Sequence, residues 1–301
     1  MAYKLHPRVE AFFKDFINSQ FESHDESAAW VKEVASRKGD WRHHSSLIER
    51  GQSSFTKEVE GLSTRDQVLI YCYYYMQMHT VSGFHVFKNA FKNQDIRFLR
   101  NLVLVDFGCG PITSAISMAW YNLANKKKAD KLKVNYIGID LSKAMRLFGN
   151  EVWTGAKDLF HDESTIDIMT RSKAQSGLVP LIEDYRQDRK LTICLNCSYY
   201  FGSESLNVDY LISLIRNLLT TFPEERVCLV FQNADNPYKN FRWEEFKGKT
   251  EDVLFPRYAD TFEQLSYNDV TAKRLQGNPH RIKLRHAVLL NHVWKDELEK
   301  E

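Results

Sequence analysis

The sequence predicts an α/β fold with a mostly parallel sheet, preceded by a helical region of about one hundred residues. Two observations carry this prediction. In the first hundred residues, apolar side chains recur at helical spacing. From residue 101 onwards, short apolar strands alternate with helices. Such alternation requires right-handed crossover connections, which place helices on both faces of a parallel sheet.

The composition is that of a globular protein. Apolar residues make up 43% of the 301 positions and charged residues 27%, which is enough to bury a sizeable core. The formal net charge is only +2, so the chain as a whole carries no signal for a polyanionic partner. No apolar run approaches the roughly 20 residues that cross a bilayer, and the first residues lack the pattern of a signal peptide. We therefore expect a cytoplasmic protein without a membrane partner.

The cysteines predict buried thiols rather than disulfides or a metal site. They lie mostly inside apolar runs, at Cys72, Cys109, Cys194, Cys197 and Cys228. Cys194 and Cys197 form a C-x-x-C pair, but the surrounding LTICLNC reads as a strand, in which residues three apart point to opposite faces. No second ligand pair completes a tetrahedral set. We therefore predict no metal ligand in this chain.

The helical region divides into three expected helices and one loop. The first helix, within residues 6–21, has one apolar face formed by Val9, Phe12, Phe13, Phe16 and Ile17. The second ends near Gly39, and residues 41–56, rich in His, Ser and Gln, are expected to form a loop. The third helix starts at Ser63, with Asp66 at the position that Glu or Gln holds in a capping box.

The rest of the chain predicts five strands, four helices and a hairpin. The strands are expected at residues 102–106, 134–140, about 165–170, 191–196 and 226–233. The helices are expected at residues 113–125, 142–160, 178–189 and 208–222. In the tail, the turn signal GNP at residues 277–279 separates two strand-like segments, which predicts an antiparallel hairpin that closes the sheet.

The first strand ends in a glycine turn, VDFGCG, that runs from Val105 to Gly110. Glycines let the backbone approach a ligand closely, and ligands of open parallel sheets bind at the carboxyl ends of the strands. Thr113 replaces the third glycine of a dinucleotide fingerprint. Asp106 would repel a pyrophosphate but could accept a hydrogen bond from an ammonium group, which favours a cationic or zwitterionic ligand. Asp140 ends the next strand, where a carboxylate can accept both hydroxyls of a ribose.

These segments, VDFGCGPITS and YIGIDLS, resemble motifs I and II of the class I S-adenosylmethionine (SAM)-dependent methyltransferases, and the resemblance extends over about residues 100–235. It implies a Rossmann-like, seven-stranded sheet whose last strand is antiparallel, with SAM as cofactor and S-adenosylhomocysteine (SAH) as product. It also implies cofactor contacts for Asp106, Gly108, Cys109, Gly110, Asp140, Leu141 and Asn196. The acid that usually contacts the adenine amine has no counterpart at the end of the third strand.

The sequence says less about the methyl acceptor. The fourth strand ends in NCSY, which matches neither the motif for methylation of exocyclic base amines nor the Pro-Cys pair that attacks pyrimidine rings. Asn196 also replaces the first acid of a catechol-type metal site. Tyr199 and Tyr200 could orient the acceptor or stack on it, or else pack against the helical region. His79 and His85 are candidate bases, although a structural role explains each of them better.

Three functions remain open at this point. In the first, residues 1–98 form a cap over a small-molecule acceptor and residues 99–301 form the methyltransferase domain. The aromatic run at residues 71–79 then packs in the core or, alternatively, over the site. In the second, the chain methylates RNA, which contacts a basic strip formed by Lys273, Arg274, Arg281, Lys283 and Arg285. In the third, the chain binds SAM without catalysis. The lysines at residues 126–128 are expected to form a solvated loop.

Overall fold

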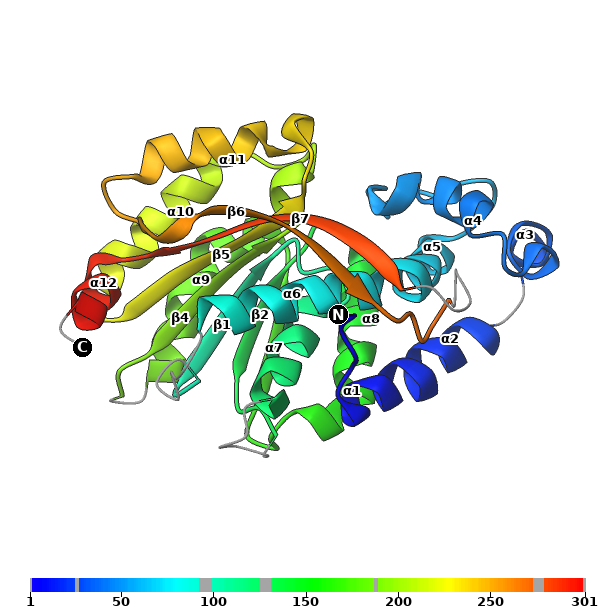
Figure 1. Cartoon of the computed structure of the whole chain (residues 1–301), viewed down its shortest axis with the longest axis horizontal. Helices are drawn as coiled ribbons and strands as arrows, with labels where there is room; N and C mark the ends of the chain where they lie inside the picture. The colour runs from blue at the N-terminus through cyan, green and yellow to red at the C-terminus, as the bar shows by residue number, and fades with distance from the viewer. Residues whose placement is uncertain are drawn as a thin grey trace.

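The computed structural model describes residues 2–24, 27–91, 99–124, 131–186, 189–272 and 279–299. A seven-stranded sheet lies at its centre, with the strand order β3-β2-β1-β4-β5-β7-β6 (Figure 1). The order reverses next to β1, so the carboxyl ends of β1 and β4 flank a switch point, which is where such sheets bind ligands. The predicted fold class, a mostly parallel seven-stranded sheet with an antiparallel hairpin and N-terminal helices, is confirmed.

Six strands run in one direction and one strand, β7, runs antiparallel to them. The strands are β1 Leu102–Phe107, β2 Asn135–Ile139, β3 Thr165–Met169, β4 Thr192–Ser198, β5 Arg226–Ala234, β6 Phe255–Tyr267 and β7 His280–Leu290. β7 pairs antiparallel with both β5 and β6. In the parallel part, Asp106 lies opposite Gly138 of β2 and Asn196 of β4, so the acid of the glycine turn sits between two strand ends.

The helices of the second part follow the strands in turn. They are α7 Thr113–Ala124, α8 Lys143–Gly155, α9 Arg171–Arg186, α10 Val208–Thr221, α11 Pro237–Thr250 and α12 His292–Glu299. Short 3₁₀-helical turns lie at Lys157–Leu159 and Tyr200–Gly202. Each of the five strands β1 to β5 is followed by a helix in the chain, as expected for α/β crossover connections.

The N-terminal region is helical, as predicted. It contains α1 Pro7–Ala11, α2 Asn18–Glu22, α3 Ala28–Glu33, α4 Trp41–Leu47, α5 Thr64–Tyr71 and α6 Gln77–Ala90. π-Helical segments at Phe12–Ile17 and Cys72–Met76 join α1 to α2 and α5 to α6, and 3₁₀-helical turns lie at Ala35–Arg37 and Glu49–Gly51. The side chain of Ser63 accepts the N–H of Asp66 and the Asp66 carboxylate accepts the N–H of Ser63, so the expected capping box is present with Asp in place of Glu.

Three expected boundaries were wrong. Residues 41–47 form helix α4 rather than a loop, because the side chain of Asp40 accepts the N–H of His43 and caps the helix. Helix α9 begins at Arg171 rather than near residue 178, and it continues through an internal proline, Pro180. The first strand of the hairpin is β6, which ends at Tyr267, rather than the segment after residue 269. Most residues of β6 are only partly buried, so the strand lacks the apolar alternation that reveals others.

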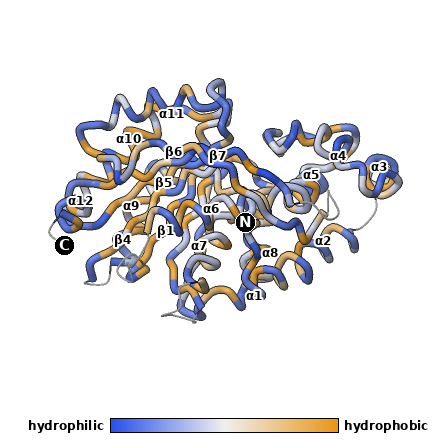
Figure 2. The backbone as a smooth tube through the Cα atoms, viewed as in Figure 1, coloured by the Kyte–Doolittle hydropathy of each residue, from blue (hydrophilic) through white to orange (hydrophobic). Residues whose placement is uncertain are grey.

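Two apolar cores lie on the two faces of the sheet. One core joins the N-terminal helices, α7 and α8 to the sheet, and the other lies under α9, α10 and α11. Figure 2 shows the apolar residues along the central strands. Cys194 belongs to the first core and Cys197 to the second, so the C-x-x-C pair does point to opposite faces. All five cysteines are free and buried.

The N-terminal helices are fastened to the hairpin. The N–H of Tyr3 donates to the carbonyl oxygen of Ser266 at 2.6 Å. The side chain of Gln77 donates to the carbonyl oxygen of Asn268 at 2.7 Å and accepts the N–H of Val270 at 2.8 Å. The helical region therefore lies beside the carboxyl ends of the central strands, next to the hairpin (Figure 1). Within the described ranges, no helix is long and apolar enough to span a bilayer.

Candidate functional site

The glycine turn after β1 has a backbone that favours glycine. Gly108 has a φ of +66° and Gly110 a φ of +51°, both in the left-handed region. The amides of Gly108 and Cys109 donate to the carbonyl oxygen of Ile139 at 2.8 and 3.2 Å. The amide of Gly110 donates to Oδ2 of Asp140 at 2.9 Å. All three N–H groups of the turn are therefore engaged within the protein.

This arrangement bears on the charge of the ligand. A phosphate-binding loop directs free backbone N–H groups at the anion, and the N–H groups of Gly108, Cys109 and Gly110 are already bonded. Two carboxylates, Asp106 and Asp140, end the adjacent strands. The local electrostatics thus disfavour a pyrophosphate over the turn and favour a positively charged group, as the sequence indicates.

Asp106 is buried and serves as an acceptor for three side chains. It is 2% exposed, and it accepts hydrogen bonds from the hydroxyl of Tyr136 and from Nδ2 of Asn196, each at 2.7 Å, and from the hydroxyl of Ser114. Burial raises the pKa of Asp106 to about 6, although the three hydrogen bonds oppose that rise. Asp106 and Asn196, both expected cofactor contacts, are thus bonded to each other beneath the turn.

A row of buried polar side chains continues from Asn196 across the sheet. The hydroxyl of Ser198 donates to Oδ1 of Asn196 at 2.9 Å, and Nε2 of Gln232 lies 2.7 Å from that hydroxyl. Gln232 is 2% exposed, and among the described residues its Oε1 has no hydrogen-bond partner. Burying an acceptor without a hydrogen bond costs free energy. The Oε1 atom of Gln232 is such an acceptor, and it lies near the carboxyl end of β5.

Asp140 and Leu141 lie where β2 ends. Asp140 accepts the N–H of Ser142 on Oδ1 at 2.8 Å in addition to that of Gly110 on Oδ2. Burial raises the pKa of Asp140, and these backbone hydrogen bonds work against the rise. Arg146 donates to the carbonyl oxygens of Asp140 and Leu141, both at 2.8 Å, and so fixes the loop. The Leu141 side chain is 53% exposed, which leaves an apolar surface for a flat ring.

Cys109 belongs to the turn, but its thiol is not exposed to solvent. Its side chain is buried, and its Sγ lies 3.6 Å from the carbonyl oxygen of Gly110. Burial raises the pKa of the thiol well above its usual value, with the charge of Asp140 as the next cause. Because the thiolate is the reactive form, Cys109 is a small packed residue rather than a nucleophile.

Tyr199 follows β4 in an unusual backbone conformation. Its φ is +59°, which is uncommon for a residue other than glycine and is often found at functional sites. Its ring stacks on His79 with a centroid distance of 4.0 Å, and its hydroxyl lies 3.2 Å from the hydroxyl of Ser82. Burial raises the pKa of Tyr199 to about 12. The structure thus brings together two predicted candidates, His79 and Tyr199.

Tyr200 covers the glycine turn. A Cβ atom at Gly108 would lie 2.7 Å from Cδ2 of Tyr200, so the ring rests directly on the glycine backbone. The ring also stacks on Phe107, at a centroid distance of 6.1 Å. Burial raises the pKa of the Tyr200 hydroxyl. Tyr199 therefore contacts the helical region, whereas Tyr200 packs on the turn itself.

The aromatic run of residues 71–79 divides between core and site. Tyr74 is buried, and its hydroxyl is hydrogen-bonded to Nδ1 of His44 at 2.7 Å. Tyr71 and Tyr75 stack on each other, and the hydroxyl of Tyr71 bonds Nδ1 of His79 at 2.7 Å. Burial raises the pKa of Tyr71, and nearby groups that include Tyr199 and Asp140 add to the rise. Tyr74 thus packs in the helical region with His44, whereas Tyr71 contacts His79.

Of the described side chains in the basic strip, only some are exposed and free of ion pairs with carboxylates. Arg281 and Lys283 are exposed on β7. Arg285, by contrast, forms ion pairs with Glu244 and Asp260. Lys273 and Arg274 lie outside the described residues, as do the lysines at residues 126–128.

His85, the second candidate base, lies in a different place. It belongs to a cluster with Glu263 and His286, and its Nε2 lies 2.6 Å from Oε2 of the glutamate. Sequence analysis did not find this cluster, because its members come from α6, β6 and β7 and no short motif connects them. Only the strand pairing of the hairpin brings Glu263 and His286 together.

No family model and no curated protein matches the chain. Among solved structures, it is similar to a SAM dependent methyltransferase from Aquifex aeolicus, with a TM-score of 0.35 and 11% identity over 72% of this chain and 98% of that one. It is also similar to the plantazolicin methyltransferase BpumL in complex with SAH, with a TM-score of 0.32 and 14% identity over 94% and 97%. A third is the SAM Dependent Methyltransferase from Agrobacterium tumefaciens, with a TM-score of 0.38 and 12% identity over 71% and 62%. Similarity this distant assigns no substrate, so function has to be judged from the site.

Proposed function

We propose that the chain is a SAM-dependent methyltransferase that transfers the methyl group to a nitrogen or oxygen of a small-molecule acceptor and releases SAH. One observation carries the proposal. The N–H of Gly110 donates to Oδ2 of Asp140 at 2.9 Å, so the glycine turn and the proposed ribose acid form one unit. This unit lies where the ends of β1 and β2 meet, and it joins the two motifs on which the resemblance rests.

The turn suits the methionine end of SAM. A methionine zwitterion carries an ammonium group, and two carboxylates, Asp106 and Asp140, lower the potential at the turn. Gly110 allows the ligand to approach the backbone because it has no side chain and a Cβ there would come no closer than 4.0 Å to Met145, whereas the ring of Tyr200 covers Gly108. Asp106 and Asn196 are bonded to each other at 2.7 Å, and we assign them the role of holding the ends of β1 and β4 in register beneath the cofactor.

Asp140 and Leu141 suit the nucleoside end. A carboxylate has about four acceptor positions, and Asp140 uses one on each oxygen for the N–H groups of Gly110 and Ser142. The remaining positions can accept the two ribose hydroxyls. The exposed Leu141 side chain, next in the chain, can pack on the adenine ring. SAM supplies the electrophilic methyl group when bound, and these residues bind and orient it.

The acceptor would lie between the turn and the N-terminal helices, which we assign as a cap of residues 1–98 on a methyltransferase domain of residues 99–301. His79 and Tyr199 are stacked there, and Tyr71 is hydrogen-bonded to His79. Much of the acceleration in methyl transfer comes from positioning the acceptor in line with the methyl group. His79 is the group that could take a proton from an acceptor that must lose one.

A small-molecule acceptor is favoured over RNA by the state of the basic strip. Arg285 is neutralised by two carboxylates, from Glu244 and Asp260. Arg281 and Lys283 are exposed and keep RNA methylation as the second candidate. A site near enclosed aromatic side chains suits a small flat or aliphatic acceptor better than an extended polyanion.

The test of the proposal is calorimetric titration of the purified chain with SAH. We expect saturable binding at one SAH per chain. Turnover of SAM is then measured separately with metabolite pools and with RNA pools. The absence of binding at millimolar SAH would contradict the whole proposal, whereas binding with methylation of RNA alone would replace the small-molecule acceptor. Binding without turnover on either pool would favour a SAM-binding protein without catalysis.

A further inference from the structure

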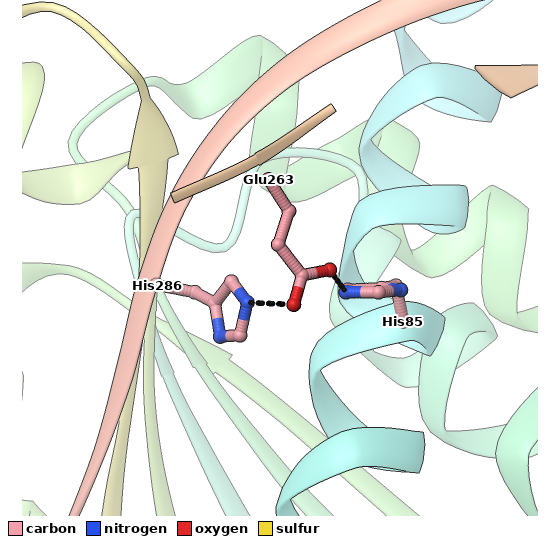
Figure 3. Close-up of side chains that lie close together, drawn as sticks. All are labelled: His85, Glu263 and His286. Carbon is pink, nitrogen blue, oxygen red and sulfur yellow. Dashed lines mark ion pairs between the residues drawn. The ribbon is translucent and has the colours of Figure 1, made fainter. Parts of the chain in front are cut away.

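Two histidines and a glutamate converge in the region where the N-terminal helices meet the hairpin (Figure 3). His85 comes from α6, Glu263 from β6 and His286 from β7. One ligand atom from each side chain lies within 4.8 Å of the other two. Nε2 of His85 lies 2.6 Å from Oε2 of Glu263, and Nε2 of His286 lies 3.8 Å from Oε1 of the same carboxylate. The glutamate thus presents one oxygen to each imidazole.

Both imidazoles are held by their other nitrogen. Nδ1 of His85 is hydrogen-bonded to the hydroxyl of Tyr3 at 2.6 Å, and Nδ1 of His286 to the hydroxyl of Tyr258 at 3.0 Å. These contacts turn both Nε2 atoms toward Glu263. Histidines that bind metals likewise have a hydrogen-bond partner on the second nitrogen, which fixes the orientation of the ring.

One of the two Nε2 atoms has no hydrogen bond. His286 is 1% exposed, and among the described residues its Nε2 has no hydrogen-bond partner, since 3.8 Å to Glu263 is too long for one. A buried unpaired nitrogen is costly.

The distances fit a small divalent ion. Bonds of about 2.0 to 2.2 Å in a tetrahedral site place neighbouring ligand atoms roughly 3.3 Å apart. The distances of 2.6 and 3.8 Å, each to a different oxygen of Glu263, lie on either side of that value, and the three ligand atoms lie within 4.8 Å of one another. Nδ2 of Asn89 lies 2.7 Å from Nε2 of His85 and would be displaced by the ion. Two imidazoles and one carboxylate favour zinc-class transition metals over calcium or magnesium.

We propose that His85, Glu263 and His286 bind one divalent transition metal ion of the zinc class, with a water molecule in the fourth position. The ion would fasten α6 to the hairpin of β6 and β7. His286 also lies opposite Gln232 of β5, the last member of the polar row in the candidate site. The bound ion would therefore stiffen one wall of that site without contact with the reacting atoms. This proposal does not depend on SAM binding.

The experiment uses the full chain without a histidine tag, treated with EDTA and then dialysed. Titration with Zn²⁺ should saturate at one equivalent, and Co²⁺ should give the ligand-field absorption of a four-coordinate site. Glu263→Gln and His286→Asn should each weaken Zn²⁺ binding by more than the 10- to 100-fold typical of losing an outer-shell partner. His292→Ala, which removes an exposed histidine of α12, should bind like the wild type.

Glu263→Gln also distinguishes a loss of metal binding from a loss of the fold. The Glu263 side chain is 35% exposed and the substitution keeps its size, so circular dichroism should show an intact fold while the Co²⁺ spectrum changes. The proposal is overturned if the wild type takes up no Zn²⁺. It is also overturned if the one-equivalent site persists unchanged in Glu263→Gln and His286→Asn. Either result would leave the cluster as a hydrogen-bonded contact between α6 and the hairpin.

Discussion

The ring of Tyr200 rests on the backbone of Gly108. A Cβ atom at Gly108 would meet Cδ2 of Tyr200 at 2.7 Å, and the φ of the glycine is +66°. Two independent constraints therefore require glycine at this position: the left-handed backbone and the ring that covers it. Tyr200 follows β4 and Gly108 follows β1, so this contact closes the ends of the two strands that flank the switch point.

We expect Gly108→Ala to weaken both the fold and the site. A left-handed conformation costs a residue other than glycine about 1 to 2 kcal/mol, and Tyr200 must also move. Urea unfolding should therefore show a lower free energy of unfolding by about that amount, and SAH affinity should fall further. The matched control is Gly177→Ala in α9, where a Cβ meets nothing within 4 Å and the stability should stay equal or rise. Equal effects of the two substitutions would contradict the role of the turn.

Much of the fold could be predicted because strands buried on both faces are almost continuously apolar. Leu102–Phe107 is buried at every position, and its alternation with helices predicted the parallel sheet. β6 could not be found in the same way, because most of its residues are only partly buried. The start of α9 was missed because Pro180 lies inside the helix, where a proline usually marks a boundary.

The site was predictable only where its residues are close in sequence or follow neighbouring strands. Asp106, Gly108, Gly110 and Asp140 belong to two short motifs, and the hydrogen bond from Gly110 to Asp140 joins them. The stacking of His79 on Tyr199 depends on how the helical region lies on the sheet, and no local pattern encodes that. The same holds for the cluster of two histidines and a glutamate.

Asp106 should make stability depend on pH. Its folded-state pKa of about 6 lies above the ordinary aspartate value of 3.8, so between these values the folded state holds more protons than the unfolded state. The contribution of Asp106 to stability is therefore largest below about pH 4 and is lost as the pH rises to about 6. The difference in unfolding free energy between wild type and Asp106→Asn should decrease over this range and level off above it.

The comparison with Asp106→Asn isolates this group from other carboxylates. Burial also raises the pKa of Asp140, but Asp140 is present in both proteins and cancels in the difference. Urea titrations at intervals between pH 4 and 7.5 provide the measurement. A difference that stays constant or increases with pH would show that Asp106 is not held at a raised pKa.

Asp140→Asn should separate the ribose contact from the structural one. The amide keeps one oxygen that can accept a backbone N–H but loses the charge that strengthens hydrogen bonds to ribose. We expect SAH affinity to fall about tenfold or more, since a hydrogen bond to a charged group contributes about 1.5 to 3 kcal/mol. Asp140→Ala should in addition lower stability, because the N–H groups of Gly110 and Ser142 lose their acceptor.

The control for Asp140 is the exposed Asp158, whose side chain is 82% exposed. Asp158→Asn should leave SAH affinity within about twofold of the wild type. A tenfold change in affinity corresponds to about 1.4 kcal/mol of binding free energy. Calorimetric titration of the three variants with SAH decides the matter. Unchanged affinity in Asp140→Asn would remove the ribose assignment while leaving the metal proposal untouched.

His79 should act on turnover rather than on cofactor binding. Its ring is held between Tyr199, on which it stacks, and Tyr71, whose hydroxyl lies 2.7 Å from Nδ1. If His79 takes the acceptor's proton, His79→Gln should lower kcat by about 100-fold or more and leave SAH affinity nearly unchanged. Tyr71→Phe, which removes only the hydroxyl that orients the ring, should have a smaller effect in the same direction. An equal loss of SAH affinity in His79→Gln would instead place His79 among the groups that shape the cofactor site, because a base for the acceptor has no reason to bind the product.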